Sequence, residues 1–298
     1  MNLKKIAAGV VFGLLPLWPG WAMAETPAYS LADLEEIALK THPSLHISGA
    51  EIKKSEADLR IARQYPNPEL EGEVSSQKGL ENGVYTTGYS IGLSQPIEWP
   101  GRRVKKQEAA RFGIDAAQNK LTQEQLNVRA RSRELYYRVL AGEQLLKNAA
   151  ENLESAKKLL DLAEKRVSLG ESRPIELIKA RVEFLTMERE YNQDKALLAR
   201  DRQILRQFLG EKLPPDFILA GERETLEPLI PLKIWQEAAF GAHPLLAAQA
   251  AQVRQAESSL GAERQAWMPD VAVKVFHTKE ADFKATGGGL SFPLPLWN

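Results

Sequence analysis

The amino-acid sequence predicts an α+β membrane protein built from an internal duplication, with long coiled-coil helices and four strands of a transmembrane β-barrel. Three observations predict this fold. Residues 31–68 align without a gap with residues 232–269, at an offset of about 201. Apolar and polar residues alternate in four short segments, which is the period of a half-buried strand. No proline occurs between Pro100 and Pro174, where strong helix formers dominate.

The first 24 residues have the order of a secretory signal peptide. Lys4 and Lys5 precede an apolar run from Ile6 to Leu17, and Ala22-Met23-Ala24 offers a small-residue cleavage site before Glu25. The alternative is an uncleaved membrane anchor, but the apolar run is shorter than the roughly 20 residues that a spanning helix needs. We therefore expect this segment to be cleaved and the mature chain to be exported.

The composition excludes several classes of function. The 298 residues hold 39 lysines and arginines against 39 aspartates and glutamates, so no global basic field predicts a nucleic-acid partner. Because the chain has no cysteine, it has no disulfide framework, no thiolate metal site and no lipid-anchoring cysteine. Catalytic motifs and Gly-rich phosphate loops do not occur in the sequence. We therefore predict that the chain is not an enzyme and binds no cofactor.

Each copy of the repeat is predicted to begin with an amphipathic helix that a His-Pro step interrupts. Ser30 and Asp33 supply a capping-box start to the first helix. His42-Pro43 and His243-Pro244 then break the two helices, because proline removes a backbone donor and clashes with the preceding turn. We interpret both histidines as structural and predict no metal site, since neither has acidic or sulfur neighbours at ligand spacing. The matching positions are Leu31, Glu36, Ala38, His42-Pro43, Leu45, Glu56, Leu59, Arg63-Gln64 and Pro68 with Leu232, Glu237, Ala239, His243-Pro244, Leu246, Glu257, Leu260, Arg264-Gln265 and Pro269.

After the last proline of each copy the apolar period becomes two, which predicts two β-hairpins. The predicted strands are 69–74 and 89–94 in the first copy and 271–275 and 287–294 in the second, with a turn near Ala281-Asp282. Segments with one apolar and one polar face suit a membrane barrel, with an amphipathic sheet of a soluble domain as the alternative. In a barrel, Leu70, Val74, Tyr89, Ile91, Leu93, Val271, Val273 and Val275 are predicted to face lipid, and Glu69, Glu71, Glu73 and Lys274 to face the lumen.

The stretch from Pro100 to Pro174 predicts one helix of about seventy residues, roughly 100 Å long. Its apolar positions recur every seven residues, which predicts left-handed supercoiling against partner helices. The two heptad series are Ile114, Leu121, Val128, Leu135, Gly142, Ala149, Ala156 and Ala163, and Val139, Leu146, Leu153, Leu160 and Val167.

A tight turn is predicted to reverse the chain after this helix. Gly170 can cap the first helix in the left-handed conformation, and Pro174 can occupy the first turn of the next. The return arm extends to Leu209-Gly210 and is about half as long as the outgoing helix. Another segment must therefore pack on the uncovered half, and the helix that begins near Leu232 is the candidate. The tip consists of Ser168, Leu169, Gly170, Glu171, Ser172, Arg173 and Pro174.

This order of elements divides the chain into a signal peptide (1–24), a first repeat (25–210), a linker (211–231) and the start of a second repeat (232–298). The same order of elements resembles the outer-membrane efflux protein (TolC) family. The segments that carry the resemblance are Tyr65-Pro66-Asn67-Pro68-Glu69-Leu70, Leu93-Ser94-Gln95-Pro96-Ile97-Glu98-Trp99-Pro100-Gly101-Arg102-Arg103, and Arg166-Val167-Ser168-Leu169-Gly170 followed by Ala180-Arg181. The first two are most similar to the branch that serves heavy-metal cation exporters. The resemblance implies a homotrimer in which each protomer contributes four strands to one barrel in outer-membrane lipid and its helices to a periplasmic tunnel.

The resemblance further implies passive export in a tripartite efflux system. An inner-membrane pump of the RND type and a periplasmic adaptor would deliver the substrate, and the tip from Ser168 to Pro174 would be the docking end for the adaptor. The branch implies heavy-metal cations as substrates, while organic solutes stay open. The alternative function is a soluble periplasmic coiled-coil adaptor, which would share the signal and the hairpin but carry lipoyl-like or barrel strands on both sides of it.

The end of the chain departs from the family. Residues Pro293-Leu294-Pro295-Leu296-Trp297-Asn298 correspond to the segment around Pro96 to Pro100 in the first copy. The family continues from this point into a second long helical hairpin that carries the periplasmic gate. We therefore expect a truncated chain that lacks roughly half of the tunnel wall and does not support efflux alone.

Overall fold

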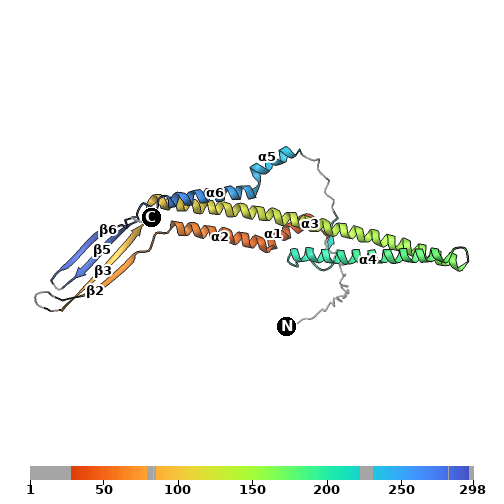
Figure 1. The fold of residues 1–298 in the computed structure, drawn as a ribbon, viewed down its shortest axis with the longest axis horizontal. Helices are drawn as coiled ribbons and strands as arrows, with labels where there is room; N and C mark the ends of the chain where they lie inside the picture. Colours follow the sequence, from red (N-terminus) through yellow and green to blue (C-terminus); the bar gives the residue numbers. More distant parts are fainter. Residues whose placement is uncertain (1–27, 79–82, 84, 222–230, 281, 295–298) are drawn as a thin grey trace, which may run out of the picture.

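The computed structural model describes residues 28–78, 83, 85–221, 231–280 and 282–294. The predicted signal peptide at 1–24 and part of the predicted linker at 211–231 lie outside the described residues. The described chain is a long rod of helices with a four-stranded sheet at one end (Figure 1).

One helix, α3 (Pro100–Ser168), runs along most of the rod. It has 69 residues, so the prediction of one helix of about seventy residues is confirmed. Its heptad positions face partner helices, and Val128, Leu135 and Val139 are almost fully buried. Burial of this apolar stripe holds the rod together, because a helix of this length gains its stability mainly from tertiary packing.

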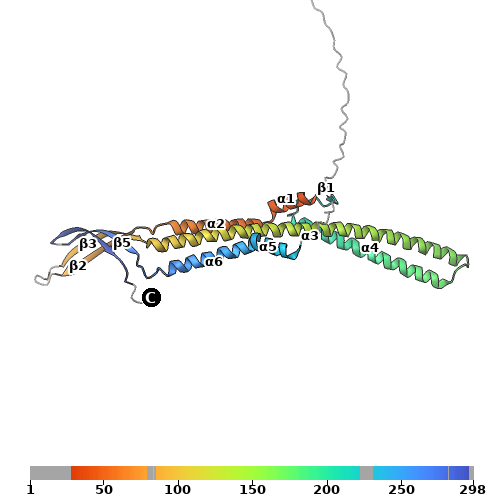
Figure 2. The same ribbon diagram turned by 90° about the horizontal axis from the view of Figure 1, so that it is seen from above.

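Three further helices pack along α3. The return arm α4 (Pro174–Phe208) covers the half that is distant from the sheet, while α2 (Pro43–Arg63) and α6 (Pro244–Glu263) lie on opposite sides of the half near the sheet (Figures 1 and 2). The prediction that the helix beginning at Leu232 packs on α3 needs correction. The predicted helix is interrupted at the His-Pro step. Only its second part, α6, lies along α3, while its first part, α5 (Leu232–Ala242), diverges from the rod.

The His-Pro steps act as helix starts in both copies. In the first copy α1 (Leu31–Thr41) ends at His42, whose imidazole Nδ1 accepts the Ser44 backbone N–H at 3.3 Å. In the second copy His243 Nδ1 accepts the Leu245 backbone N–H at 3.2 Å. Each imidazole therefore caps the helix that its own proline begins, which confirms the structural interpretation of both histidines.

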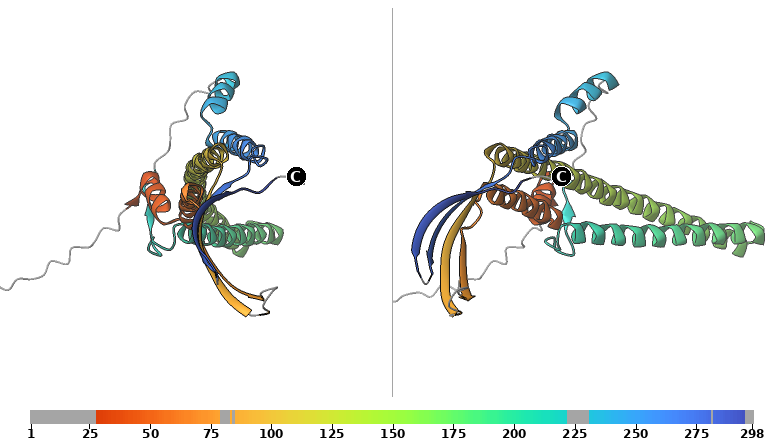
Figure 3. Two further views of the ribbon diagram at one scale, coloured as in Figure 1. Left: turned by 90° about the vertical axis from the view of Figure 1, so that its left-hand side faces the viewer. Right: turned by 60° about the vertical axis from the view of Figure 1, so that its left-hand side comes forward.

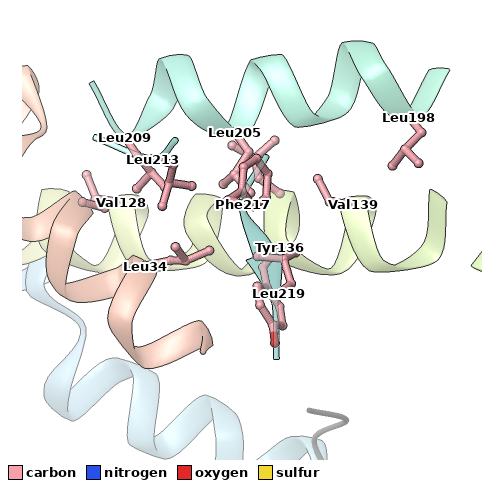
Figure 4. Close-up of a cluster of buried hydrophobic side chains, with 12 residues drawn as sticks. Leu34, Val128, Tyr136, Val139, Leu198, Leu205, Leu209, Leu213, Phe217 and Leu219 are labelled. Carbon is pink, nitrogen blue, oxygen red and sulfur yellow. The ribbon is translucent and has the colours of Figure 1, made fainter. Parts of the chain in front are cut away.

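An apolar core lies where α1, α3, α4 and the chain after α4 meet (Figure 4), near the middle of the rod (Figure 1). Leu34 of α1, Tyr136 of α3 and Leu205 of α4 are fully buried there, as is Phe217. A short parallel pair, β1 (Ala28–Tyr29) with β4 (Ile218–Leu219), closes this core. The predicted capping box is confirmed, since Ser30 Oγ accepts the Asp33 N–H at 3.2 Å and the Asp33 carboxylate accepts the Ser30 N–H at 2.9 Å. The Ser30 hydroxyl, which donates to this carboxylate at 2.7 Å, and then the Ser30 N–H lower the pKa of Asp33.

The sheet has the strand order β2 (Glu69–Lys78), β3 (Tyr85–Ile97), β5 (Val271–Lys279) and β6 (Lys284–Ser291), with all neighbours antiparallel. It is strongly curved (Figure 3). The first hairpin joins the second through β3 and β5, so the two repeats share one sheet. The last strand was predicted at 287–294, but it starts earlier and ends earlier because it pairs residue for residue with β5. None of the described helices is both long and apolar enough to cross a membrane.

Candidate functional site

The strand register separates the sheet into an apolar face and a polar face. Leu70, Leu93 and Val275 lie opposite one another in a single cross-strand row, and residues paired in this way point to the same side. The adjacent row, which contains Glu69 and Lys274, points to the other side. The register places Leu70, Val74, Tyr89, Ile91, Leu93, Val271, Val273 and Val275 on the apolar face and Glu69, Glu71, Glu73 and Lys274 on the polar face.

The apolar face is uncovered in the single chain. Leu70 is 74% exposed, Val74 is 77% exposed and Leu290, which the sequence patterns did not single out, is 70% exposed. Isolated exposed apolar residues are ordinary, but a contiguous apolar face on four strands requires an apolar neighbour. This exposed face is therefore suited to contact with lipid or with another apolar surface.

The polar face carries one ion pair that spans three strands. Lys274 Nζ on β5 donates to Glu71 Oε1 on β2 at 3.1 Å. The strand between them has Gly92 opposite Glu71 and the small Ser94 opposite Lys274, so the ion pair runs diagonally across it. A hollow of about 240 Å³ lies here and is also lined by Glu73. Of the three β2 carboxylates, only that of Glu71 has an ion-pair partner among the described residues.

An aromatic side chain on the polar face was missed by the sequence analysis. Phe276 pairs with Gly92 and Gly287, so it lies on the face of the charged residues. Its ring covers Gly287, where an added Cβ would lie 2.7 Å from Phe276 Cζ. An aromatic residue across from a strand glycine compensates for the missing side chain. The signal in the sequence was Gly287, whose missing side chain leaves room for a large side chain on the neighbouring strand.

A cluster of charged side chains joins the sheet to α3 and the first repeat to the second. Arg102 donates to Glu98 Oε1 at 3.2 Å and to Asp270 Oδ2 at 2.8 Å, and the Trp99 backbone N–H donates to Asp270 Oδ1 at 3.0 Å. Lys106 also pairs with Glu98. Burial alone would raise the pKa of Glu98, but the hydrogen bonds and charges of Lys106 and Arg102 outweigh it and hold that pKa below its usual value. The Arg102–Asp270 contact thus ties the first turn of α3 to the residue that precedes β5.

The predicted tip lies at the far end of the rod from the sheet (Figure 1). Gly170 has a φ of +73°, and the Glu171 N–H donates to the Arg166 carbonyl at 2.9 Å, as the predicted left-handed cap requires. Pro174 occupies the first turn of α4, with Arg173 before it. Leu169 is 72% exposed at the end of the hairpin.

A groove runs between the two helices beside this tip. It encloses about 470 Å³, and its lining includes Leu159, Leu162, Arg166, Ser172 and Glu176. The lining therefore combines apolar and charged side chains, as protein interfaces do. In the described part of the chain no group of three or more His, Asp or Glu side chains is placed to hold a metal ion.

Residues 34–211 match the Outer membrane efflux protein family, which is more than half of the chain. The Cobalt-zinc-cadmium resistance protein CzcC of Cupriavidus metallidurans is 27% identical over 264 residues, covering 88% of this chain and 62% of CzcC. Among solved structures, CusC superposes with a TM-score of 0.73 at 18% identity, covering 90% of this chain and 66% of CusC. The CmeC outer membrane channel of Campylobacter jejuni superposes with a TM-score of 0.71 at 18% identity, covering 90% of this chain and 61% of CmeC. The chain thus spans a little over three fifths of the length of these proteins.

Proposed function

Because this chain belongs to the outer membrane efflux protein family, we propose that it is a subunit of an outer-membrane channel that conducts solutes passively from the periplasm to the exterior. The observation that carries the proposal is a curved sheet with one apolar and one polar face, attached directly to a long helical rod. A sheet of this kind can meet lipid on one side and water on the other. The rod then extends the water-filled path into the periplasm.

The open edges of the sheet support a trimeric assembly. β2 and β6 are edge strands, so one side of each has no strand partner within the described chain. Backbone N–H and C=O groups without hydrogen-bond partners are costly in lipid. A sheet avoids this cost only by closing into a barrel that has no free edge. Four strands are too few to close, so we propose that three copies join edge to edge into one barrel.

We propose divalent heavy-metal cations as the substrates. The similarity to a cobalt-zinc-cadmium resistance protein supports this class, and so do the carboxylates of Glu69, Glu71 and Glu73 on the polar face. Fixed negative charge along a wide pore raises the local concentration of cations without binding them tightly. Because transport through such a pore needs no chemical step, we propose that the chain is not an enzyme.

The energy for export must come from elsewhere, so we propose an inner-membrane RND-type pump and a periplasmic adaptor as partners. The tip from Ser168 to Pro174 is the docking end in this proposal, because it is the part of the rod most distant from the sheet (Figure 1). The alternative function, a soluble adaptor, is less well supported. Both β-hairpins join in one sheet at one end of the rod, whereas an adaptor would carry strands of a different architecture on both sides of its hairpin.

Membrane fractionation tests the proposal. We expect the chain to sediment with the outer membrane and, without heating, to migrate in an electrophoresis gel at the size of a trimer that boiling converts to the monomer. Recovery in the soluble periplasmic fraction as a monomer would contradict the channel and favour the adaptor. Zinc flux through vesicles that contain the purified chain tests the substrate class separately, with a Glu69→Gln, Glu71→Gln, Glu73→Gln variant as the matched comparison.

A further inference from the structure

Three lysines interrupt the apolar face of the sheet, all at the end that is farthest from the helices (Figure 1). Lys78 ends β2, Lys279 ends β5 and Lys284 begins β6, and each is exposed. The register places them on the same face as Leu93 and Val275. The three glutamates of β2 all lie on the opposite face and nearer the helices. These three lysines and the three glutamates of β2 are therefore separated both by face and by height, whereas Lys274 lies on the face of the glutamates.

Two of these lysines face each other directly. Lys279 and Lys284 are directly opposite each other in the β5–β6 hairpin, so their side chains lie side by side on the same face of the sheet. Like charges directly opposite each other destabilise a hairpin. Within the described residues neither ammonium group has a carboxylate at ion-pair distance. An anion between the two lysines would remove this repulsion.

Tyrosine side chains accompany the lysines. Tyr89 lies opposite Lys279 in the next strand, and the Lys279 ammonium is 6.0 Å from the centroid of its ring. At the end of the first hairpin Lys78 lies over the ring of Tyr85 at 5.5 Å. Tyrosine and lysine together on a lipid-facing surface are typical of the level of the lipid headgroups, where a lysine costs little, and not of the hydrocarbon centre, where it costs most.

We propose that Lys279 and Lys284 bind the phosphate of an anionic lipid headgroup at the outer rim of the barrel, with Tyr89 packed beside the bound lipid. The inference rests on the proposed function, because it requires the apolar face to lie in the membrane. Phosphate oxygens accept hydrogen bonds from both ammonium groups and neutralise the pair. A lipid fits better than a free ion because the site adjoins the apolar surface of Ile91 and Leu93, which acyl chains cover.

Native mass spectrometry of the full chain in neutral detergent, with the diphosphorylated glycolipid lipid A as the probe, tests this site. We expect lipid A to remain bound to the unmodified chain and to bind more than tenfold more weakly to the Lys279→Gln, Lys284→Gln variant, at about fivefold per lysine. Lys274→Gln is the matched control, since it removes one charge from the same hairpin on the opposite face, and it should keep its lipid A. Flotation with phosphatidylcholine vesicles reports separately whether each form enters a membrane.

The outcomes distinguish the headgroup site from the proposed function. Equal retention of lipid A by the double variant and the unmodified chain, with both floating, overturns the headgroup site and leaves the channel intact. Displacement of lipid A by millimolar inorganic phosphate shows a free-anion site and overturns the assignment to a lipid. Failure of the unmodified chain to float overturns the membrane-spanning sheet and the headgroup site together.

Discussion

Lys274 of the second hairpin reaches across a whole strand to bind Glu71 of the first, with 3.1 Å between Nζ and Oε1. The two residues lie on β5 and β2, and the pair runs diagonally across β3, where Glu71 is opposite Gly92 and Lys274 is opposite Ser94. The pair neutralises one of the three carboxylates on the polar face, so the position of one lysine sets the net negative charge that the face presents to water.

Lys274→Gln is therefore expected to increase the preference of the channel for cations. Removal of the one lysine on the polar face of β5 leaves Glu71 free to contribute its charge. The permeability ratio of potassium to chloride should rise by roughly twofold, since one charge beside a water-filled path contributes less than about 1 kcal/mol at physiological salt. Reversal potentials across planar bilayers measure this ratio. Lys233→Gln, in α5, should leave it unchanged, and an equally unchanged ratio for Lys274→Gln would place the polar face away from the conduction path.

Single cysteines are expected to distinguish the two faces of the sheet. The natural chain has no cysteine, so each variant gives an unambiguous signal. A membrane-impermeant thiol reagent should modify Glu73→Cys and Ser90→Cys, which lie on the polar face, while Leu93→Cys and Val275→Cys in the same strands or the next stay protected by lipid. Detergent should make all four react. Equal labelling of both sets in intact membranes would show that the apolar face is not in lipid.

The faces of the sheet were predictable because the alternation of side chains has a period of two and a slip by one residue reverses every side chain. Leu70 and Glu71 could therefore be assigned to opposite faces before the strand order was known. The pairing of Lys279 with Lys284 could not, because it depends on where β6 begins. The glycine run in β6 gives no apolar alternation from which to read that start.

The helices show the same division between local and tertiary causes. The ends of α3 follow from Pro100 and from Gly170 after its last turn, and both signals act within a few residues. The divergence of α5 has no such local signal. α1 and α5 occupy equivalent places in the repeat, yet Leu34 of α1 is fully buried while its counterpart Trp235 is 59% exposed. Tertiary contacts decide that difference, and the core around Leu34 is contributed by α3 and α4.

The charged cluster between sheet and rod is expected to make stability depend on acid pH. The folded-state pKa of Glu98 is lowered, so its contribution to stability is fully present above the unfolded-state pKa and is lost as the pH falls through the lower folded-state pKa. Glu98→Gln should lower stability at neutral pH and flatten the acid dependence. Urea unfolding at stepped pH values measures both effects. The control is Glu154→Gln, which breaks a fully exposed pair with Lys158 and should change the stability at neutral pH and its acid dependence much less. Identical pH profiles for the two variants would contradict the role of Glu98 in this acid dependence.

Two glycines in open surroundings are expected to respond in opposite ways to alanine. Gly170 at the tip has a φ of +73°, and an added Cβ would meet no atom within 4 Å, so Gly170→Ala should cost about 1 kcal/mol through backbone conformation alone. Gly49 lies inside α2 with equally open surroundings, so Gly49→Ala should stabilise by about 1 kcal/mol through helix propensity. Urea unfolding midpoints report both. Stabilisation by Gly170→Ala would show that the turn does not need the left-handed conformation.

The tip is expected to be the contact point for a periplasmic adaptor. Leu169 offers an exposed apolar side chain at the end of the hairpin, with polar residues on either side, and the groove beside it holds charged and apolar groups. A buried apolar anchor with a polar rim is typical of specific protein interfaces. Photo-cross-linkers at Ser168 and Ser172 should therefore capture the adaptor far more often than one at Lys147, which is exposed on α3 away from the tip. Leu169→Asp should reduce the yield at Ser172, because it places a charge where the anchor would be buried. Equal yields at the tip and at Lys147 would show that the adaptor docks elsewhere along the rod.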